Sequence, residues 1–301
     1  MTKKPDLSII ILNYNTRELL DGCLRSLEKV RAELSFEVVV VDNGSDDDSV
    51  EFVRKKYKWV RLVETGKNLG FARGNNYAKD IINSEHVLFL NSDTVVPAGT
   101  LSGSLGYLKK HKLGALGCKL ILPDGSLDKD ARRSFITPWI GMVHLFLKLD
   151  RIFPRSKLFA KYWYGYISDD KIHEVDALQG AFFLTSKDIL DKVGWFDEDY
   201  FLDGEDIDLS WKIKNSGYKI FYYPKVIITH IKGATKGKNG EKKKNVSFGE
   251  KLKYRLSGVN SMEIFYCKRL WGNYPLILNY IVLVGIKVLK FLRIINLILF
   301  K

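Results

Sequence analysis

Short runs of apolar, mostly β-branched residues recur along the first third of the chain, and each is followed by a helical pattern. They occupy residues 7–12, 36–41, 59–63 and 86–90. Runs of this length and composition are typical of strands that are buried on both faces of a parallel sheet. Strands that alternate with helices also predict right-handed crossovers. The sequence therefore predicts an α/β fold with a mostly parallel central sheet and helices on both faces.

Polar side chains follow three of these runs. They are residues 13–15 (NYN), 42–46 (DNGSD) and 91–93 (NSD). In an open α/β sheet, ligands bind in the crevice beyond the carboxyl ends of the strands. Because parallel strands end at one edge, we expect the three clusters to meet there and form a binding site.

Asp42 and Asp93 are the acids in these clusters that suit a nucleotide ligand. Asp42 ends its strand, where we expect an exposed carboxylate that accepts the N3–H of uracil or thymine. The alternative is an Asx turn that Asp42 begins with Asn43 and Gly44. Asp93 is placed to ligate a hard divalent cation shared with a diphosphate. Turn capping alone would also explain an acid at that position.

Residues 203–208 (DGEDID) form an acidic stretch that opens a helical pattern. Asp203 is the expected N-cap, and Glu205 would lie in the first turn, where N–H groups and the helix dipole favour carboxylates. Asp208 would reach Lys212 one turn later. Capping and ion pairing therefore explain much of this acidity without catalysis.

Asp206 differs from the other acids of this stretch. Helical spacing groups it with Leu209 and Ile213, so its carboxylate should point inward or into a cleft. A carboxylate held against apolar surface has its pKa raised toward that of a general base. Catalysis and helix capping are the two interpretations of this residue.

His230 closes an apolar strand at residues 226–229 and stands just before a basic segment. A lone histidine in such a place is usually buried and hydrogen-bonded. Together with Asp93 it would instead form a mixed oxygen and nitrogen site suited to Mn²⁺ or Mg²⁺.

Composition limits the remaining choices. The chain has 301 residues, which suits one large α/β domain with an appendage. Its net charge of +13 implies an anionic partner such as nucleic acid, lipid headgroups or a phosphorylated substrate. The three cysteines match no metal spacing and fit buried thiols in a reducing cytosol. We expect no export signal, because the apolar run at residues 7–12 is too short.

The last part of the chain changes character twice. Residues 232–255 are rich in lysine and glycine, which predicts a mobile loop that serves either solubility or the binding of phosphates or lipid headgroups. Residues 275–301 are mostly apolar, and Lys287, Lys290 and Arg293 would form one stripe on a helix. This pattern favours a helix lying in a membrane interface. The alternative is a helix packed on the protein's own core or on a partner subunit.

The motifs together resemble the glycosyltransferase family 2 enzymes of GT-A fold, especially the rhamnosyltransferase-like branch. The resemblance covers roughly residues 7–231. Its motifs stand in family order: residues 8–16 (SIIILNYNT), 40–46 (VVDNGSD), 68–76 (NLGFARGNN), 87–94 (VLFLNSDT), 179–183 (QGAFF), 193–201 (VGWFDEDYF) and 204–209 (GEDIDL), followed by His230.

The resemblance implies roles for individual residues. Glu205 and Asp206 are similar to the family's ED motif, whose aspartate is the general base. Asp93 is similar to the metal-binding acid of the DXD motif, although Asn91 replaces the first acid, and His230 would be the second metal ligand. The residues expected to bind the donor are Asn13, Tyr14, Asn15, Asp42, Asn68, Arg73, Asn91, Asp93, Gln179 and Gly180.

The activity that the resemblance implies is an inverting, metal-dependent transfer of a sugar from a UDP- or dTDP-sugar, with dTDP-rhamnose one candidate. The acceptor would be a hydroxyl of a glycan or lipid-linked molecule in cell-surface polysaccharide or glycoconjugate synthesis. We expect a cytoplasmic enzyme at the inner face of the membrane, with no nucleic-acid partner. The expected parts are a GT-A domain at residues 1–231 (nucleotide half 1–96, acceptor half 97–231), a basic loop at 232–255 and a membrane-associating helical region at 256–301.

Two other classes of protein have to be weighed. A nucleotidyltransferase would need a glycine-rich, basic loop after the first strand, and residues 13–15 (NYN) do not form one. A non-catalytic protein that binds anionic surfaces would carry basic residues along the strand ends. This chain places Asp42, Asp93 and Asp206 there instead.

Overall fold

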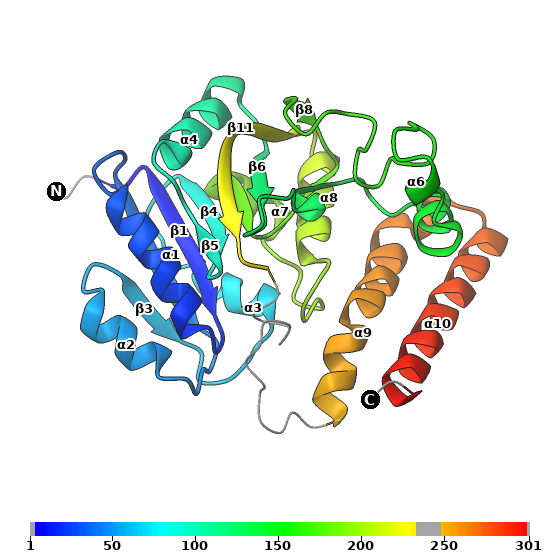
Figure 1. Cartoon of the computed structure of the whole chain (residues 1–301), viewed down its shortest axis with the longest axis horizontal. Coiled ribbons are helices and arrows are strands. Elements are labelled where there is room, and N and C mark those ends of the chain that lie inside the picture. The colour runs from blue at the N-terminus through cyan, green and yellow to red at the C-terminus, as the bar shows by residue number, and fades with distance from the viewer. Residues whose placement is uncertain (1–3, 233–247, 300–301) are drawn as a thin grey trace.

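The computed structural model describes residues 4–232 and 248–299 of the chain. Its main feature is a nine-stranded sheet in the order β3-β2-β1-β4-β10-β6-β11-β5, with β8 paired to β11 (Figure 1). The strands are β1 (Leu7–Asn13), β2 (Phe36–Asp42), β3 (Arg61–Glu64), β4 (His86–Asn91), β5 (Thr94–Val95), β6 (Ala115–Ile121), β8 (His173–Glu174), β10 (Phe182–Ser186) and β11 (Ile220–His230). A small second sheet pairs β7 (Arg132–Arg133) with β9 (Ala177–Leu178).

Most strands of the large sheet share one direction. β1, β2, β3, β4, β6 and β11 run together, and β5, β8 and β10 run the opposite way. The predicted α/β fold is therefore confirmed, with β10 as an antiparallel strand in the middle. The apolar strand expected at residues 226–229 is part of the longer strand β11. Its register shifts between Tyr223 and Ile227, because a proline cannot donate to the ladder and is accommodated by a bulge.

Helices cover the sheet on both sides (Figure 1). They are α1 (Arg17–Lys29), α2 (Ser49–Lys56), α3 (Phe71–Asn76), α4 (Thr100–His111), α7 (Lys187–Val193) and α8 (Glu205–Asn215). In β1, Leu7 and Ile9–Ile11 are at most 1% exposed, and they join Leu20, Leu24 and Leu27 of α1 in the main core. Each such side chain contributes about 1.5–3 kcal/mol through its removal from water. This core fixes the strand ends that border the site.

A second, smaller core lies beside the sheet. It forms between α9 (Phe248–Phe265), the π-helical turn Tyr266–Leu270, α10 (Leu276–Leu299) and the side of α8 that carries Ile207 and Trp211. The segment with α5 (Pro138–Gly141), the π-helical turn Met142–Leu147 and α6 (Leu149–Ile152) lies near the ends of α9 and α10 (Figure 1). The helices α9 and α10 pack side by side, coloured orange and red in Figure 1. Because α9 begins at Phe248, residues 248–255 are helical, although they were expected in the basic loop. The remainder of that loop, residues 233–247, lies outside the described residues.

The helix α10 buries one side and exposes the other. Asn279 and Ile286 are buried against the protein, while Ile277 and Phe291 are 78% and 62% exposed. Two of the three expected basic stripe residues turn toward α9: Lys290 pairs with Glu263, and Arg293 donates to the Arg255 carbonyl. Among the described residues, no helix combines the length and the apolar character that crossing a bilayer requires.

A buried ion pair fastens the helical region to the sheet domain. The Asp208 carboxylate, fully buried, accepts from Arg269 Nε at 2.7 Å and from Nη2 at 3.1 Å, and also from the Tyr200 hydroxyl at 3.2 Å. Lys212, the partner expected from sequence, instead donates to the Trp195 carbonyl. The i,i+4 pairing with Lys212 does not form, because Asp208 is buried against Arg269, in the π-helical turn Tyr266–Leu270 that follows α9.

The Arg269→Met substitution tests this attachment. It leaves the Asp208 carboxylate buried without its counter-charge, so we expect the free energy of unfolding to fall by about 3 kcal/mol or more. Lys268→Met is the matched control. Lys268 pairs with Asp197 and Asp199, but its side chain is 34% exposed, and its loss should cost less than about 1 kcal/mol. Equal losses in urea unfolding would show that the Arg269 pair does not have this special role.

Candidate active site

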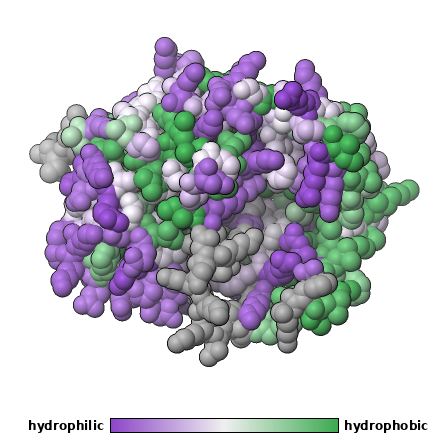
Figure 2. Space-filling view, viewed as in Figure 1, coloured by the Kyte–Doolittle hydropathy of each residue, from purple (hydrophilic) through white to green (hydrophobic). Residues whose placement is uncertain are grey.

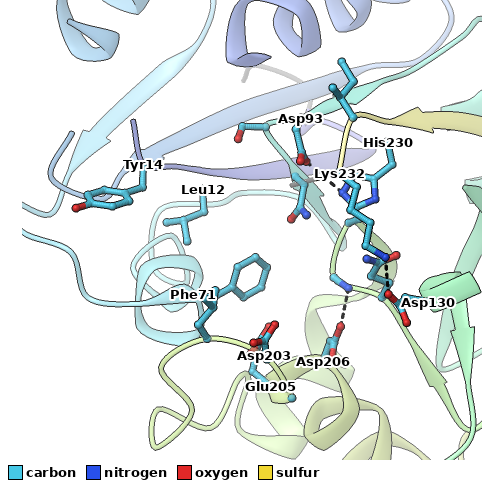
Figure 3. Close-up of a pocket in the computed structure, with 18 of the residues that line it drawn as sticks. Leu12, Tyr14, Phe71, Asp93, Asp130, Asp203, Glu205, Asp206, His230 and Lys232 are labelled. Atoms are coloured by element: carbon cyan, nitrogen blue, oxygen red, sulfur yellow. Dashed lines mark hydrogen bonds and ion pairs between the residues drawn. The ribbon is translucent and has the colours of Figure 1, made fainter. Parts of the chain in front are cut away.

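A cavity of about 820 Å³ opens at the carboxyl ends of the parallel strands, at the predicted edge (Figure 3). Segments from β1 to β11 and the N-terminus of α8 contribute to its wall. The sequence-predicted residues that line it are Tyr14, Asn68, Asn91, Asp93, Gln179, Gly180, Glu205, Asp206 and His230. Side chains from both halves of the sheet domain therefore meet in one place.

Four predicted donor-binding residues, Asn13, Asn15, Asp42 and Arg73, do not line the cavity. Asp42 is only 2% exposed, so the expected exposed carboxylate is wrong. Its oxygens accept from Asn13 Nδ2 and from the backbone N–H of Ser45, both at 2.9 Å, so the carboxylate stabilises the turn after β2. Asn15 Oδ1 accepts from the backbone N–H of Asp46.

Arg73 lies on the exposed side of α3. Its Nε is 3.4 Å from Glu198, and it does not line the cavity. The neighbours Asn43 and Phe71 do line the wall on this side. These four residues lie outside the cavity wall. Their roles in donor binding stay predictions from the sequence.

Asp93 and His230 are adjacent, as predicted. His230 Nε2 lies 3.2 Å from Asp93 Oδ1, and its Nδ1 lies 2.8 Å from Asp128 Oδ2. Burial by itself would lower the pKa of His230, but the hydrogen bonds to Asp128 and Asp93 raise it to about 9. The imidazole is therefore held between two carboxylates.

This arrangement fits a divalent cation. Two ligands bound to a small cation at about 2.1 Å and at right angles lie about 3.0 Å apart, close to the Asp93–His230 separation. Asp128 behind the ring fixes the tautomer that presents Nε2, as carboxylates behind metal-binding histidines do. Within the described residues, no group of three or more acidic, histidine or cysteine side chains forms a complete site. Phosphate or water oxygens would therefore have to supply the other ligands.

Lys232 extends this network across the cavity wall. Its Nζ is 2.7 Å from Asp128 Oδ1 and 2.5 Å from Asp130 Oδ2. Burial would lower the pKa of Lys232, but the two acids raise it, so the ammonium stays charged. It is a cationic side chain at the cavity that also orients the carboxylate behind His230.

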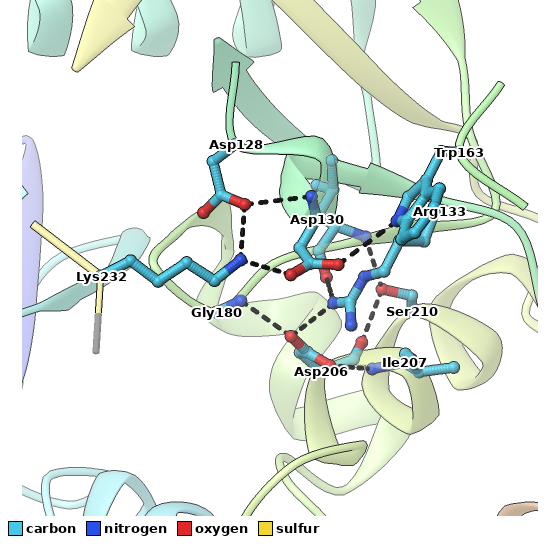
Figure 4. Close-up of polar contacts among 10 residues, drawn as sticks. Asp128, Asp130, Arg133, Trp163, Gly180, Asp206, Ile207, Ser210 and Lys232 are labelled. Carbon is cyan, nitrogen blue, oxygen red and sulfur yellow. Dashed lines mark hydrogen bonds and ion pairs between the residues drawn. The ribbon is translucent and has the colours of Figure 1, made fainter. Parts of the chain in front are cut away.

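Asp206 is held by an arginine rather than by apolar surface (Figure 4). Its Oδ2 accepts from Arg133 Nη2 at 2.6 Å and from the Gly180 backbone N–H at 3.0 Å. The same Arg133 nitrogen donates to the Leu178 carbonyl at 2.9 Å. Arg133 and the Gly180 N–H therefore orient the Asp206 carboxylate, and the guanidinium balances its negative charge. The sequence had predicted apolar surroundings instead.

The neighbouring acid, Glu205, is buried beside two other carboxylates. Burial and the charges of Asp206 and Asp203 raise the pKa of Glu205 well above its usual range. Its Oε2 is buried and has no hydrogen-bond partner among the described residues. This burial and the neighbouring acids favour the neutral form of Glu205.

The start of α8 sets the positions of both acids. The N-cap is Gly204, not Asp203 as expected, and it has a φ of 88° that favours glycine. A Cβ on Gly204 would also lie 2.8 Å from the Ser261 Cβ of α9. The close approach of α9 therefore requires glycine in front of Glu205.

Sequence reasoning missed Arg133, Asp128 and Asp130, and it considered Lys232 only as part of the basic segment 232–255. The first three belong to the stretch 128–133 (DKDARR), which follows β6. A signal was present, since acids and arginines crowd six residues just after a strand end. The contacts that this stretch makes across the sheet have no sequence signature.

The mixed sheet and the acidic cavity at the carboxyl ends of its parallel strands define an α/β protein whose ligand site lies at that edge. The chain belongs to the family described as "Glycosyltransferase like family 2", whose model matches residues 5–246, and it is a glycosyltransferase. An N-acetylglucosaminyl-diphospho-decaprenol L-rhamnosyltransferase of Mycobacterium tuberculosis is 26% identical, over 77% of this chain and 78% of the relative. Family membership sets aside the nucleotidyltransferase and the non-catalytic binder.

Two solved structures share the fold. GalNAc-T7 with UDP, GalNAc and Mn²⁺ gives a TM-score of 0.57 at 15% identity, over 76% of this chain and 44% of that one. The mannosyltransferase PcManGT from Pyrobaculum calidifontis, in complex with GDP-Man and Mn²⁺, gives 0.54 at 20% identity, over 86% and 64%. The chain spans less than two thirds of either structure. The GT-A fold is thereby confirmed.

The His230 network predicts a pH-dependent stability. The pKa of His230 is about 9 in the native state and 6.5 in the unfolded state. Between these two pH values the native imidazole is therefore protonated and the unfolded one is not. Stability from this group is complete below pH 6.5 and disappears as the pH rises through about 9. In EDTA we expect wild type to lose about 3 kcal/mol between pH 6 and 9 through this group.

Urea unfolding at the two pH values measures this loss. His230→Gln should remove most of the pH dependence, and His111→Gln, at an exposed position on α4, should retain it. An unchanged pH dependence in His230→Gln would contradict the proposed charge state of the ring.

Proposed function

We propose that the enzyme transfers a sugar from a UDP- or dTDP-sugar to a hydroxyl of a lipid-linked acceptor, with inversion at the anomeric carbon. The observation that carries this proposal is the shared cavity. Asp93 and His230 lie on one wall, and Glu205 and Asp206 lie on another, with room between them for a sugar. The M. tuberculosis relative is named for transfer to a diphospho-decaprenol acceptor, which supports the lipid-linked class.

The donor diphosphate would bind beside Asp93, His230 and Lys232. A Mn²⁺ or Mg²⁺ ion held by Asp93 and His230 would neutralise charge that develops on the leaving diphosphate. Lys232 adds a fixed positive charge on the same side. Both similar solved structures are described with Mn²⁺, which supports the choice of cation.

Asp206 is the general base in this proposal. Its carboxylate accepts the proton of the acceptor hydroxyl, whose oxygen then attacks the anomeric carbon from the face opposite the nucleotide. Arg133 and the Gly180 N–H keep the carboxylate in position during this step. The raised pKa of Glu205 disfavours a second negative charge next to the base.

The Asp206→Asn substitution tests the base. Asparagine keeps a side-chain oxygen for Arg133 and nearly the same shape, so the fold and donor binding should persist. We expect turnover of UDP- or dTDP-sugars to fall at least about a hundredfold. Calorimetry with UDP and dTDP in Mn²⁺ measures donor binding, and release of the nucleotide diphosphate measures turnover. Asp188→Asn, at an exposed position on α7, is the control. Near-normal turnover in Asp206→Asn would reject this role.

The acceptor class implies work at a membrane surface, and the exposed apolar residues support it. All but three of the large exposed apolar side chains among the described residues lie on α10 or within residues 139–158. Figure 2 shows them gathered on the side of the molecule where these segments lie. We call this set the apolar surface. We propose that it inserts into the inner face of the cell membrane, with the protein peripherally bound.

A triple substitution of the apolar surface tests the membrane role. Ile277→Gln, Phe291→Gln and Leu292→Gln remove side chains that are 78%, 62% and 54% exposed. Each contributes about 1 kcal/mol or more when it leaves water, so co-sedimentation with phosphatidylglycerol vesicles should fall at least about tenfold. The matched control changes the three exposed apolar residues elsewhere, Tyr77, Ile227 and Phe248, to glutamine. An equal loss of co-sedimentation in both triple variants would contradict the assignment of the apolar surface to the membrane.

A further inference from the structure

A second cavity, of about 460 Å³, lies between the helical region and the sheet domain. Its walls come from α9, α10 and the segment from Ile136 to Phe146, and most of its lining is aliphatic or aromatic. The catalytic steps above make no use of this space. An apolar cavity that opens to solvent holds water poorly, because few polar groups in its wall can bond to that water.

The inner end of this second cavity adjoins the active site. Arg133, Asp203 and Gly204 line both cavities. Arg133 is the residue whose guanidinium holds the Asp206 carboxylate, and Ile207, next to Asp206 in the chain, lines the second cavity. A molecule that fills the second cavity therefore ends within reach of the general base.

The outer end opens on the apolar surface. Met142 and Phe146 on one side and Ile281 and Val284 on the other line the cavity and are also between 42% and 60% exposed. These four side chains belong to the surface that the membrane role assigns to the bilayer. The cavity thus runs from an apolar exterior to the catalytic carboxylates.

We infer that the second cavity binds the apolar chain of the lipid-linked acceptor, next to the diphosphate or saccharide head that the active site takes. The inference rests on the proposed function and names where its acceptor is held. The chain would enter between α10 and the 136–146 segment and pass along α9, and the head would emerge beside Gly204 to meet Asp206. Removal of the chain from water supplies the binding free energy, and the shared lining residues set the depth of the head.

A lipid chain fits these observations better than a protein segment does. The walls offer few side-chain donors or acceptors, whereas a peptide would bring backbone N–H and C=O groups that need partners. The charged groups among the lining residues are Arg133 and Asp203, at the inner end, where a polar head would lie. Charge at one end and apolar walls along the rest match an amphipathic ligand with a single polar head.

Two valines of α10 allow a matched test. Val284 lines the cavity and is 60% exposed, whereas Val288, one turn later, is 45% exposed and does not line it. Val284→Trp narrows the mouth and Val288→Trp adds the same bulk outside it. Both retain an apolar outer face, so membrane affinity should change little between them. Met142→Trp narrows the mouth from the opposite wall and gives a second, independent variant.

Calorimetry with farnesyl phosphate, and with inorganic phosphate as the head alone, reads out binding. We expect wild type and Val288→Trp to bind farnesyl phosphate equally, and at least tenfold more tightly than inorganic phosphate. Val284→Trp and Met142→Trp should weaken that binding at least tenfold, with thermal unfolding unchanged. If at least one narrowing variant folds as wild type and binds as wild type, or if farnesyl phosphate binds no better than phosphate, the inference is overturned.

The same proteins separate this inference from the proposed function. Asp206→Asn should keep the gain in affinity of farnesyl phosphate over inorganic phosphate, because the base does not line the second cavity and acts on both heads alike. If the narrowing variants weaken farnesyl phosphate binding while Asp206→Asn leaves turnover unchanged, the cavity assignment holds and the proposed function fails. If turnover depends on Asp206 while the narrowing variants bind as wild type, the reverse is true. A third outcome is that wild type forms dimers, that Val284→Trp dissociates them, and that neither protein binds farnesyl phosphate. This outcome would assign the cavity to a second copy of the chain and overturn the inference.

Discussion

The contact between Arg133 and Asp206 is the interaction on which the active site depends. It joins β7, which follows the stretch of residues 128–131, to the first turn of α8. Both side chains are at most 11% exposed, so each needs the other: an unpaired charge at that depth would cost about 3–5 kcal/mol. The pair therefore orients the carboxylate and also holds two distant segments in register. A base on a helix N-terminus would otherwise have only its own backbone to fix it.

A second chain of contacts closes the cavity on the other side. Asp93, at the end of β4, touches His230, at the end of β11, and Asp128 lies behind it. The strands β4 and β11 are not neighbours in the sheet, since β10 and β6 separate them. The acid–imidazole–acid series therefore spans the sheet edge and ties its two halves together. A divalent cation at Asp93 and His230 would use a site that the apo protein already holds together through charge.

The sequence predicted the fold and the site edge well because these depend on local pattern. The sequence shows the β-branched runs of the buried strands and the polar clusters after them directly. It also shows the pair Glu205 and Asp206, and His230. What could not be predicted depends on contacts between distant segments. Asp42 was expected to be exposed, but Asn13 and the Ser45 amide enclose it. Arg133 contacts Asp206 from 73 residues away, and Asp208 finds Arg269 61 residues later. Helix spacing alone favoured wrong neighbours for both acids.

The first turn of α8 explains why two adjacent acids behave differently. Asp206 faces Arg133 and the Gly180 amide, which balance its charge. Glu205 faces the other way, into a buried place between Asp206 and Asp203, where ionisation would bring like charges together. Consecutive residues on a helix point about 100° apart, so neighbouring positions sample different surroundings. The close packing of α9 on Gly204 fixes this turn, and through it the helical region that carries the apolar surface also positions the catalytic carboxylates.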